Sequence, residues 1–546
     1  MDIALLNQTN ADIFIDAFIK MGIDCFCFSP GSRSNPLLFA LKKHSHIKKV
    51  VHFDERGISF FALGYGKVWQ KPAVLFVTSG TAVGNLYPAV MEGSLSRTPL
   101  IVLTADRPQE YFKSGANQSC DQQKIFSLYA NQQYDVSFSD PLLNPEFFTH
   151  LSKKTFEACM LPYPGIAHVN CQFREPLLTD IAPTIPSSKD IYISWPEYRI
   201  SEKALVDIKG LINKKKKGLI VIGECRHPIA IHLLENLSKK LQWPIYADLT
   251  SKIKFRHAHI ISSYSLNEQI ADQIEIVLHI GGKLVDKQAQ KIFKKVSTYV
   301  MVNEDLHPQD PENVASHKYV SDLTPFVRDI TNLIDDQTDI SWLKKWQTHS
   351  IQIFHVIDSY FNEHNELSEP YLFWSLNHKN MAGLFIGNST PIRTAHLLFH
   401  PKKLSHFLGT NRGLSGIDGN IATSLGMSLA LKSPMICVLG DLTALHDLNS
   451  LAMLKNHPFP MTIIVLNNQG GGIFSSLPIP DKGDFFEEYV ATTHEWNFSK
   501  IAEAFQLNHE TDLNFSSYQK NLVEISIDKN KTAKIMTEIS EMIKKI

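Results

Sequence analysis

Two strand ends in the last third of the chain carry polar residues that could hold a divalent cation. The apolar run 436–442 closes on Asp441, and the run 461–468 closes on Asn468 and is followed by glycines at 470–472. The spacing of 27 residues between Asp441 and Asn468 leaves room for one crossover helix and a neighbouring parallel strand, so their side-chain oxygens should lie side by side. Mg²⁺ prefers such oxygens together with phosphate oxygens and water, and glycines let the backbone approach a diphosphate closely. The spacing therefore predicts a magnesium diphosphate site.

A turn near the amino terminus combines a helix start with a guanidinium group. The apolar run 24–29 is followed by Ser32 and Arg33, and Asn35-Pro36 then supply an N-cap and a first helical residue. Backbone N–H groups, the helix dipole and the arginine fork together favour a carboxylate or a phosphate at this turn. A simple turn with a surface arginine fits the same residues.

Two further strand ends in the first third of the chain carry charged residues. Glu55 closes the run 50–55, and a carboxylate at the end of an apolar strand is expected to be partly buried and to need a partner. The run 99–105 leads into Arg107, which puts another guanidinium on the same rim. An ordinary ion pair is the alternative to catalysis at this rim. It would be formed among Asp54, Glu55, Arg56, Asp106 and Arg107.

Short β-rich apolar runs alternate with amphipathic helical stretches along the whole chain. This alternation predicts an α/β protein with three doubly wound, mainly parallel sheets, one in each of the blocks 1–180, 190–340 and 366–546. A Pro- and Ser-rich stretch at 181–190 and a polar helical stretch at 340–365 connect the blocks. Ligands of such sheets bind beyond the carboxyl ends of the strands, where the polar residues described above lie.

The composition excludes several classes of protein. The chain has 546 residues, of which 44% are hydrophobic and 20% charged, as in folded globular proteins and unlike disordered ones. Its 54 basic and 55 acidic residues give a formal net charge of -1, which argues against a nucleic-acid partner. The apolar runs are shorter than the roughly 18 residues of a membrane span, and the acidic, polar start does not resemble a secretory signal. The odd number of cysteines, seven, predicts no disulfide framework. We therefore expect a cytoplasmic protein of several domains.

The motifs at these strand ends closely resemble those of one family. They are FSPGSRSNPL (28–37), HFDERG (52–57), TSGTAVGNLYPAVMEG (78–93), LTADRP (103–108), NRGLSGIDG (411–419), GDLTALHDLN (440–449) and NNQGGGIFSSLP (467–478). The family is that of the 2-succinyl-5-enolpyruvyl-6-hydroxy-3-cyclohexene-1-carboxylate (SEPHCHC) synthases of menaquinone biosynthesis, which depend on thiamine diphosphate. The resemblance covers both outer blocks almost end to end and the middle block mainly in architecture. It implies a pyrimidine-binding first domain, a Rossmann-like central domain and a diphosphate-binding third domain.

The resemblance also implies a reaction and its cofactors. The family consists of transferases (carboligases) that decarboxylate 2-oxoglutarate and add the resulting succinyl carbanion equivalent to isochorismate by 1,4-addition, with release of CO₂. The cofactors are thiamine diphosphate and Mg²⁺, with Mn²⁺ as an alternative ion; the organic cofactor supplies the electron sink and the protein supplies orientation and electrostatics. The implied assembly is a homodimer or homotetramer with active sites between subunits, without a nucleic-acid or membrane partner.

Several residues match cofactor-binding positions of the family. Glu55 matches the glutamate that contacts the aminopyrimidine ring and promotes its imino form. Ile417 matches an apolar wedge that bends the cofactor, although its position also suits a core residue of a helix. The matching Mg²⁺ ligands are Asp441, Asn468 and the carbonyl of Gly470. The other matching cofactor contacts are Asn388, Ser389, Leu442, Thr443, Gly470, Gly471, Ile473 and Phe474.

Other residues match substrate-binding positions of the family. Those that match isochorismate contacts are Ser32, Arg33, Arg107, Gln118 and Lys287. Arg393 and Arg412 match residues that face the succinyl carboxylate, and guanidinium forks suit the two dianionic substrates. An apolar wall over the reacting carbons would consist of Ile473, Phe474 and Leu477. We expect the basic residues to converge from the three blocks. Gln288 stands where some relatives have a second basic residue, so the contribution of the middle block to isochorismate binding rests on Lys287.

Three other functions fit parts of the pattern. A 2-oxo acid decarboxylase or an acetolactate-type ligase would share the cofactor, but a small neutral acceptor does not need four arginines. A catalytically silent binding protein of the same fold would not need Glu55, Asp441 and Asn468, which are all present. A nicotinamide dehydrogenase is disfavoured because a convincing G-x-G-x-x-G is missing between the first strand and helix. The histidine pairs at 44/46 and 257/259 are too isolated to predict a zinc site.

Overall fold

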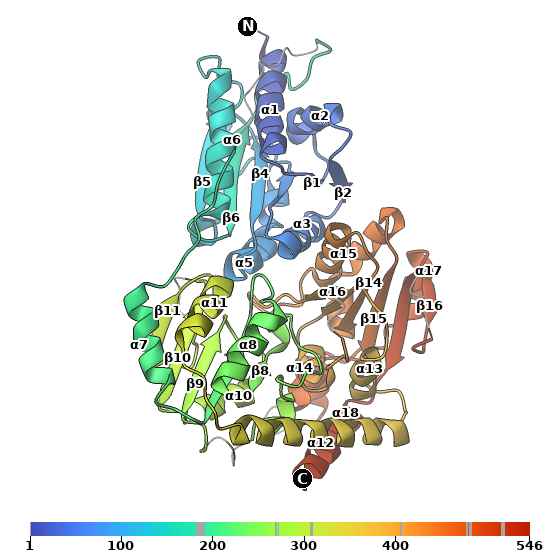
Figure 1. Cartoon of the computed structure of the whole chain (residues 1–546). Coiled ribbons are helices and arrows are strands. Elements are labelled where there is room, and N and C mark those ends of the chain that lie inside the picture. The colour runs from blue at the N-terminus through green and yellow to red at the C-terminus, as the bar shows by residue number, and fades with distance from the viewer. Residues whose placement is uncertain are drawn as a thin grey trace.

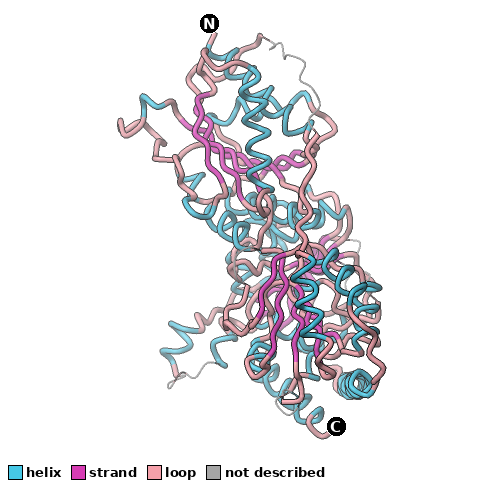
Figure 2. The backbone as a smooth tube through the Cα atoms, turned by 60° about the vertical axis from the view of Figure 1, so that its left-hand side comes forward, coloured by secondary structure: helices cyan, strands magenta, loops and turns pink. Residues whose placement is uncertain are grey.

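Three parallel sheets flanked by helices make up the protein, which is described here by a computed structural model (Figure 1). The structure describes residues 2–181, 192–267, 270, 272–305, 309–403, 407–476, 479, 483–514 and 519–546. The first sheet stands above the other two, which lie side by side, and the two termini lie at opposite ends of the molecule. In the view turned by 60° the strands again form an upper and a lower group (Figure 2). Every described strand pair within the sheets is parallel, which confirms the predicted fold class.

The first sheet has six strands in the order β2-β1-β3-β4-β6-β5. Its strands are β1 (Cys25–Phe28), β2 (Lys48–Val51), β3 (Ala73–Val77), β4 (Leu100–Asp106), β5 (Gln132–Ser137) and β6 (Ile166–Gln172). Its helices are α1 (Ile3–Lys20), α2 (Asn35–Ala40), α3 (Glu55–Trp69), α4 (Thr81–Gly84), α5 (Tyr87–Leu95) and α6 (Pro145–Met160). Because β1 lies between β2 and β3, the strand order reverses there, and such a switch point opens a crevice beyond the strand ends.

The second sheet has five strands in the order β11-β10-β9-β7-β8. Its strands are β7 (Gly218–Ile222), β8 (Ile245–Ala247), β9 (Ile276–Ile280), β10 (Thr298–Asn303) and β11 (His317–Val320). Its helices are α7 (Glu202–Ile212), α8 (Ile231–Leu241), α10 (Lys287–Phe293) and α11 (Leu323–Leu333). Strands β7, β8, β9 and β10 are buried almost throughout, as expected of a parallel sheet covered on both faces.

The third sheet has six strands in the order β13-β12-β14-β15-β17-β16. Its strands are β12 (Gly383–Ile386), β13 (Phe407–Gly409), β14 (Met435–Gly440), β15 (Met461–Asn467), β16 (Asn508–Glu510) and β17 (Lys520–Ser526). Its helices are α13 (Glu369–Leu376), α14 (Thr390–Leu398), α15 (Asn420–Leu431), α16 (Asp441–His446), α17 (Phe498–Ala504) and α18 (Lys529–Ile543). The strand order reverses between β12 and β14, as it does between β1 and β3 in the first sheet.

A long helix, α12 (Ser341–Glu363), joins the second and third sheets. Trp342 and Trp346 near its start pack in the core of the second sheet, and Ile353 and Ile357 pack in a core of the third. The helix runs along the foot of the molecule beneath both sheets (Figure 1). The helical connector predicted at 340–365 is therefore confirmed. Across the described part of the chain, no helix is both long enough and apolar enough to cross a bilayer.

Helices α3 and α15 form the main contact between the first and third domains. Residues of both helices belong to one hydrophobic core. The helices approach so closely that a Cβ on Gly64 would lie 2.1 Å from the carbonyl oxygen of Thr423, and a Cβ on Gly426 would lie 2.0 Å from that of Phe61. Glycine is therefore needed at both crossing positions, and the pair of helices fixes the first domain on the third.

The structure corrects the predicted strand at 50–55. Strand β2 ends at Val51 and pairs only with β1, so it is an edge strand with alternating burial. Asp54 caps α3 by accepting the N–H groups of Arg56 and Gly57, and Glu55 is the first residue of the helix. A side-chain cap ends the extended backbone earlier than the apolar pattern suggests.

The structure also places Ile417 outside a helix, because α15 begins only at Asn420. Ile417 is 36% exposed and precedes α15, so the alternative that it is a core residue of a helix is wrong.

Candidate functional site

Asp441 lies at the junction of two adjacent strand ends of the third sheet. Gly440 of β14 is in register with Leu466 of β15, which brings Asp441 beside the turn after β15. Oδ2 of Asp441 accepts the N–H groups of Asn468 at 3.1 Å and Gly470 at 2.9 Å. The prediction that Asp441 and Asn468 lie side by side is confirmed.

The oxygen atoms of this turn converge in a way that fits a divalent cation. The carboxamide end of Asn468 lies 2.5 Å from the carbonyl oxygen of Gly470 and 3.2 Å from Oδ2 of Asp441. With its nitrogen toward these two oxygens the amide donates to both, and a half-turn would bring its oxygen to the same place. A carboxylate, a carboxamide and a carbonyl oxygen are suitable ligands of Mg²⁺, so the residues present fit this ion.

The turn after β15 is tightly packed and largely buried around Asp441. A Cβ on Gly470 would lie 2.7 Å from the carbonyl oxygen of Ala491, and its φ of +144° is one that L side chains rarely adopt. Burial raises the pKa of Asp441 above its ordinary value, and the N–H groups of Gly470 and Leu442 oppose this rise. His494, whose Nε2 lies 3.4 Å from Oδ2 of Asp441, adds a side chain that no sequence motif indicated.

The amino ends of two helices flank the switch point of the third sheet. Ser389 has a φ of +74° and immediately precedes α14, while Leu442 and Thr443 lie in the first turn of α16. Since β12 and β14 are neighbours, the two helix starts lie on either side of the same crevice. N–H groups at helix starts favour a diphosphate, which agrees with the positions inferred for these three residues.

The side chain of Asn388 holds a loop. Its amide donates to the carbonyl oxygens of Asn411 and Gly416, each at 2.8 Å, and its Oδ1 accepts from Nη1 of Arg412 at 3.0 Å. Asn388 is 3% exposed, so these bonds are largely shielded from water. Asn388 therefore positions the loop that carries Arg412, in addition to the cofactor contact expected from the sequence.

Arg393 and Arg412 form a cationic pair beside this crevice. Burial lowers the pKa of Arg412, the carboxylates of Asp248 and Glu224 oppose this, and the charge of Arg393 adds to the lowering. Arg393 lies exposed on α14. Two guanidinium groups near enough to repel each other favour an anion between them.

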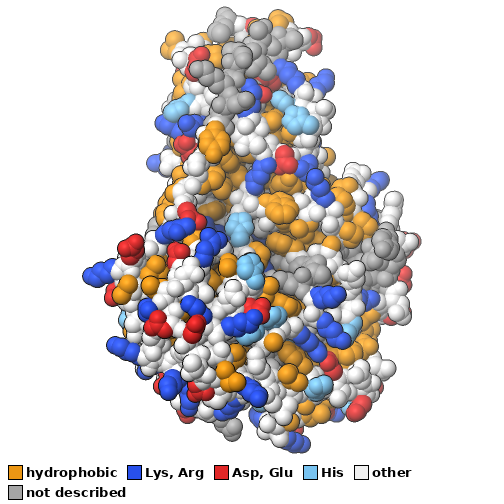
Figure 3. Space-filling model, in the orientation of Figure 1, with side chains coloured by type: hydrophobic (Ala, Val, Ile, Leu, Met, Phe, Trp, Pro, Cys, Tyr) orange, Lys and Arg blue, Asp and Glu red, His pale blue; other side chains and the backbone are white. Residues whose placement is uncertain are grey.

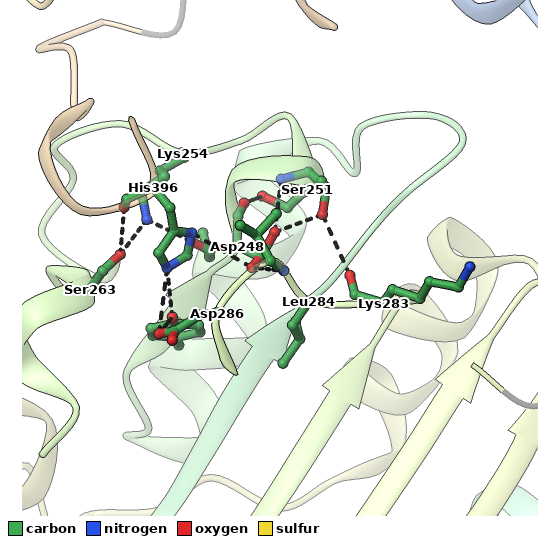
Figure 4. A network of polar contacts seen from close by, with 12 residues as sticks. Asp248, Ser251, Lys254, Ser263, Lys283, Leu284, Asp286 and His396 are labelled. Carbon is green, nitrogen blue, oxygen red and sulfur yellow. Dashed lines mark hydrogen bonds and ion pairs between the residues drawn. The ribbon is translucent and has the colours of Figure 1, made fainter. Parts of the chain in front are cut away.

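A buried polar network joins α14 to the second domain (Figure 4). Nδ1 of His396 lies 3.6 Å from Oδ2 of Asp248, and Nε2 lies 3.6 Å from Oδ2 of Asp286. Arg393 is on the same helix as His396, and Lys287 is the first residue of the helix that Asp286 caps. The network thereby ties the helix that carries Arg393 to the helix start that carries Lys287.

Further bonds in the network compensate for the burial of its charges. Tyr246 donates to Oδ2 of Asp286 at 2.5 Å, and its oxygen lies 2.8 Å from Nε2 of His396. Burial alone would raise the pKa of Asp286, but the bonds and charge of His396 and Tyr246 hold it well below its usual range. Burial lowers the pKa of Lys254 to about 8, and its ammonium donates to Ser263.

A second cationic pair lies at the switch point of the first sheet. Nη1 of Arg107 donates to Oγ of Ser79 at 2.7 Å and to the carbonyl oxygen of Gln118 at 2.6 Å. Arg33 donates to Glu175 at 2.6 Å. Burial lowers the pKa of Arg107, and the charge of Arg33 lowers it further. Exposed Ser32 lies next to Arg33, so the four residues predicted to bind isochorismate in this block share one rim.

Glu55 is half-buried and has a partner, as expected, but it lies at the start of α3 and not at a strand end. Its Oε2 accepts the amide of Asn85 at 3.2 Å. Its neighbours bind the segment after α16: Arg56 donates to the carbonyl oxygen of His446 at 2.7 Å, and Asp54 accepts the amide of Asn449 at 2.9 Å. Asp54, Glu55 and Arg56 therefore bind these neutral groups, in place of the ion pair that was the alternative to catalysis at this rim.

The remaining predicted residues lie at the margins of the site. Phe474 is 38% exposed, and its ring lies against Gly471, where a Cβ would meet the ring at 2.6 Å. Ile473 is next to it in the same short helical turn. Lys287 and Gln288 are both exposed, and Leu477 lies outside the described residues.

The predicted substrate residues fall into two groups within one chain. One group lies in the first domain and contains Ser32, Arg33, Arg107 and Gln118. The other lies where the third domain meets the second and contains Lys287, Arg393 and Arg412. Among the hydrogen bonds and ion pairs of the described residues, none joins the two groups.

Hydrophobic side chains gather at the surface near the notch between the first and third domains (Figure 3). Val51 and Phe53, which precede α3, are 54% and 62% exposed, and Leu414 in the loop before α15 is 46% exposed. Large apolar side chains that remain exposed near a candidate site favour contact with a further protein surface.

Family models of thiamine pyrophosphate enzymes match the three parts of the chain. The model of the N-terminal TPP binding domain matches residues 8–125, that of the middle domain residues 194–386, and that of the C-terminal TPP binding domain residues 386–533. The chain belongs to the family of thiamine pyrophosphate enzymes.

The chain is also similar to several proteins that share one name. The chain is 33% identical to the 2-succinyl-5-enolpyruvyl-6-hydroxy-3-cyclohexene-1-carboxylate synthase of Bacillus pumilus, with 97% of each chain covered. It is 32% identical to the protein of the same name from Psychromonas ingrahamii, over 99% of this chain and 96% of the relative. A third relative of that name, from Rubrobacter xylanophilus, is 32% identical over 92% of this chain and 90% of its own.

Proposed function

We propose that the protein decarboxylates 2-oxoglutarate and adds the remaining succinyl carbanion equivalent to isochorismate by 1,4-addition, giving SEPHCHC and CO₂ in menaquinone biosynthesis. The observation that carries the proposal is that guanidinium groups lie on two separate rims, Arg33 and Arg107 at the strand ends of the first sheet and Arg393 and Arg412 at those of the third. Two dianionic substrates need two such rims, whereas a small neutral acceptor needs one. The names of relatives at 32–33% identity over nearly the full length point to the same reaction.

Thiamine diphosphate supplies, when bound, the electron sink that a decarboxylation requires. Asp441, Asn468 and the carbonyl of Gly470 would hold its Mg²⁺, and the helix starts at Ser389 and Thr443 would orient its diphosphate. These residues act by binding and orientation. Mg²⁺ requires oxygen ligands, which the turn after β15 provides. The diphosphate requires N–H donors, which the two helix starts provide.

Glu55 would exchange a proton with a ring nitrogen of the aminopyrimidine. The carboxyl is half-buried, and the amide of Asn85 binds its Oε2. Burial of this region against a second subunit would also exclude water from the reacting carbon.

We further propose that each active site is formed by two subunits of a homodimer or homotetramer. Glu55 is bonded within the first domain, whereas the oxygen cluster around Asp441 lies in the third, and the exposed Val51 and Phe53 lie beside Glu55. A partner subunit that covers these apolar side chains would bring its own third domain to Glu55.

Mass analysis of the products tests the proposed reaction. The protein is incubated with 2-oxoglutarate, isochorismate, thiamine diphosphate and Mg²⁺, and the expected product has the summed mass of the two substrates less CO₂. Incubation without isochorismate should consume little 2-oxoglutarate. Turnover of pyruvate in place of 2-oxoglutarate would contradict the proposal and favour an acetolactate-type ligase.

A further inference from the structure

A buried carboxylate outside the proposed site connects the first domain to the third. Glu92 lies on α5 of the first domain and is 3% exposed. Its Oε1 accepts the N–H of Gly413 at 3.0 Å, and its Oε2 accepts the N–H of Leu414 at 2.8 Å. Both oxygens of one carboxylate therefore bind successive backbone N–H groups of a loop that is more than 300 residues away in the chain.

A lysine completes this contact. Nζ of Lys67, on α3, lies 3.3 Å from Oε1 of Glu92 and donates to the carbonyl oxygen of Thr410 at 3.2 Å. The ammonium thus neutralises the buried carboxylate and binds the same loop three residues before the N–H that Glu92 accepts. A buried charge with a charged partner and two N–H donors is well compensated, which makes it a rigid attachment point.

The loop at 410–416 depends on such contacts for its conformation, because it belongs to neither β13 nor α15. A Cβ on Gly413 would lie 2.5 Å from the backbone oxygen of Glu92 and 2.9 Å from its Oε2. The absence of a side chain at position 413 therefore allows the carboxylate to reach the backbone. On its other side the loop is held by Asn388, as described above.

The contacts of Glu92 and Lys67 with the 410–416 loop form a clamp, and the loop that this clamp holds carries Arg412. Its two flanking segments are fixed, by Lys67 on Thr410 and by Glu92 on Gly413 and Leu414, and its guanidinium donates to Asn388. A displacement of the loop would move the guanidinium by a similar distance. Misplacement of a charged group by about 1 Å is enough to lose much of its interaction with a substrate.

We propose that Glu92 is a positioning residue for substrate binding: it fixes the 410–416 loop so that Arg412 meets a carboxylate of the 2-oxo acid. Glu92 itself does not touch the substrate. The role of Arg412 rests on the proposed function, whereas the attachment of the loop does not.

Steady-state kinetics of Glu92→Gln test the positioning role. A glutamine keeps the size of the side chain but offers one acceptor, and its NH₂ group faces the other N–H of the loop. We expect the KM for 2-oxoglutarate to rise about tenfold or more, while kcat and the KM for isochorismate change less than about threefold. Glu157→Gln on α6, a carboxylate of the same domain whose side chain is 39% exposed, is the matched control and should behave as the wild type.

Gly413→Ala tests the same contact from the other side. Its Cβ should push the loop away from Glu92 and raise the KM for 2-oxoglutarate in the same way. The double variant should show little more than either single change, because both remove one contact. Equal effects on both substrates, or an unchanged KM for 2-oxoglutarate in both variants, would overturn the positioning role.

Hydrogen exchange of the substrate-free protein separates this inference from the proposed function. Peptides that cover 410–416 should exchange at least about tenfold faster in Glu92→Gln than in the wild type or in Glu157→Gln. If Glu92→Gln does not fold, the same measurement on Gly413→Ala decides. Unchanged exchange of the loop would overturn the clamp even where SEPHCHC is formed. Faster exchange in a protein that forms no SEPHCHC would leave the clamp intact and reject the reaction.

Discussion

Asp441 shows how the surroundings of one residue specify a ligand. Its carboxylate accepts the N–H groups of Leu442, Asn468 and Gly470, and the carboxamide of Asn468 lies beside it and beside the carbonyl oxygen of Gly470. The carboxylate, carboxamide and carbonyl oxygens that this turn offers are ligands of the kind that Mg²⁺ prefers.

Replacement of Asp441 by alanine should abolish the Mg²⁺-dependent part of cofactor affinity. The change removes the charged ligand, so we expect thiamine diphosphate to bind about 100-fold more weakly in the presence of Mg²⁺. Calorimetric titration with and without a chelator measures this difference. Asp512→Ala, an exposed carboxylate of the same domain, is the control. Equal binding by Asp441→Ala and the wild type in Mg²⁺ would contradict the assignment.

Replacement of Glu55 by glutamine should affect turnover more than binding. The amide keeps the shape of the side chain but cannot hold the exchangeable proton, so kcat should fall about 100-fold or more. The affinity for thiamine diphosphate should stay within about threefold of the wild type in a fluorescence titration. Near-native turnover would remove Glu55 from the mechanism.

At the scale of elements, the crossing of α3 and α15 places the residues proposed to bind the cofactor in the first domain relative to those proposed in the third. Glu55 is the first residue of α3, and Asp54 and Arg56 on either side bind Asn449 and His446 of the segment after α16. Since glycines allow the two helices to touch through their backbones, small changes at the crossing should be transmitted to both domains.

Gly426→Ala should therefore destabilise the protein strongly. Its Cβ would lie 2.0 Å from the carbonyl oxygen of Phe61, so the helices must separate, at a cost of about 3 kcal/mol. Thermal and urea unfolding measure this loss. Gly210→Ala, in α7, is the matched control: its Cβ meets nothing within 4 Å, so alanine should be neutral or stabilise the helix by about 1 kcal/mol. Equal stability of the two variants would show that α3 and α15 do not touch as described.

At the scale of the whole molecule, the chain holds the two sets of proposed site residues apart. Arg33, Arg107 and Glu55 lie in the first domain, while Asp441 and Arg412 lie in the third. The basic residues that were expected to converge thus form two groups within one chain. Convergence stays a prediction for the assembled protein, in which a second copy would supply the missing half of each site.

Hybrid dimers test this arrangement. Glu55→Gln and Asp441→Ala should each be inactive as homodimers. A heterodimer with one chain of each kind contains one site with both changes and one site with neither, so it should have about half of the wild-type activity. Coexpression with two different tags and purification on both isolates the heterodimer. No activity in the heterodimer would show that Glu55 and Asp441 act from the same chain.

Acid should destabilise all three domains through buried histidines. Burial lowers the pKa of His168 to about 3, and of His279 and His457 to about 4. A histidine whose folded pKa is depressed contributes stability that is present above pH 6.5 and is lost as the pH falls towards the folded pKa. For His279 this loss is about 2 kcal/mol at pH 5.

Unfolding curves of the wild type and His279→Gln between pH 7.5 and 4.5 measure this contribution. Glutamine can still accept from the hydroxyl of Tyr299, which lies 2.8 Å from Nδ1 of His279. The difference in free energy of unfolding between the two proteins should shrink as the pH falls. Parallel curves would contradict the role of His279.

The fold class and the approach of Asp441 to Asn468 follow from the sequence alone. Alternating apolar runs predict parallel sheets, and parallel strands end at one edge of a sheet, so the spacing of Asp441 and Asn468 was sufficient to place them together. These conclusions depend on local periodicity and on rules of strand order. They need no knowledge of which side chains pack across domains.

The contacts that hold these elements together become visible only in the folded protein. Glu55 begins a helix because Asp54 caps it, Glu92 binds a loop of another domain, and His396 lies between two carboxylates of the second. Each of these contacts joins residues that are distant in the chain or depends on a local cap that competes with the apolar pattern. Such contacts depend on how side chains pack between domains. This packing produces no periodic pattern in a single sequence, so it cannot be predicted from the sequence.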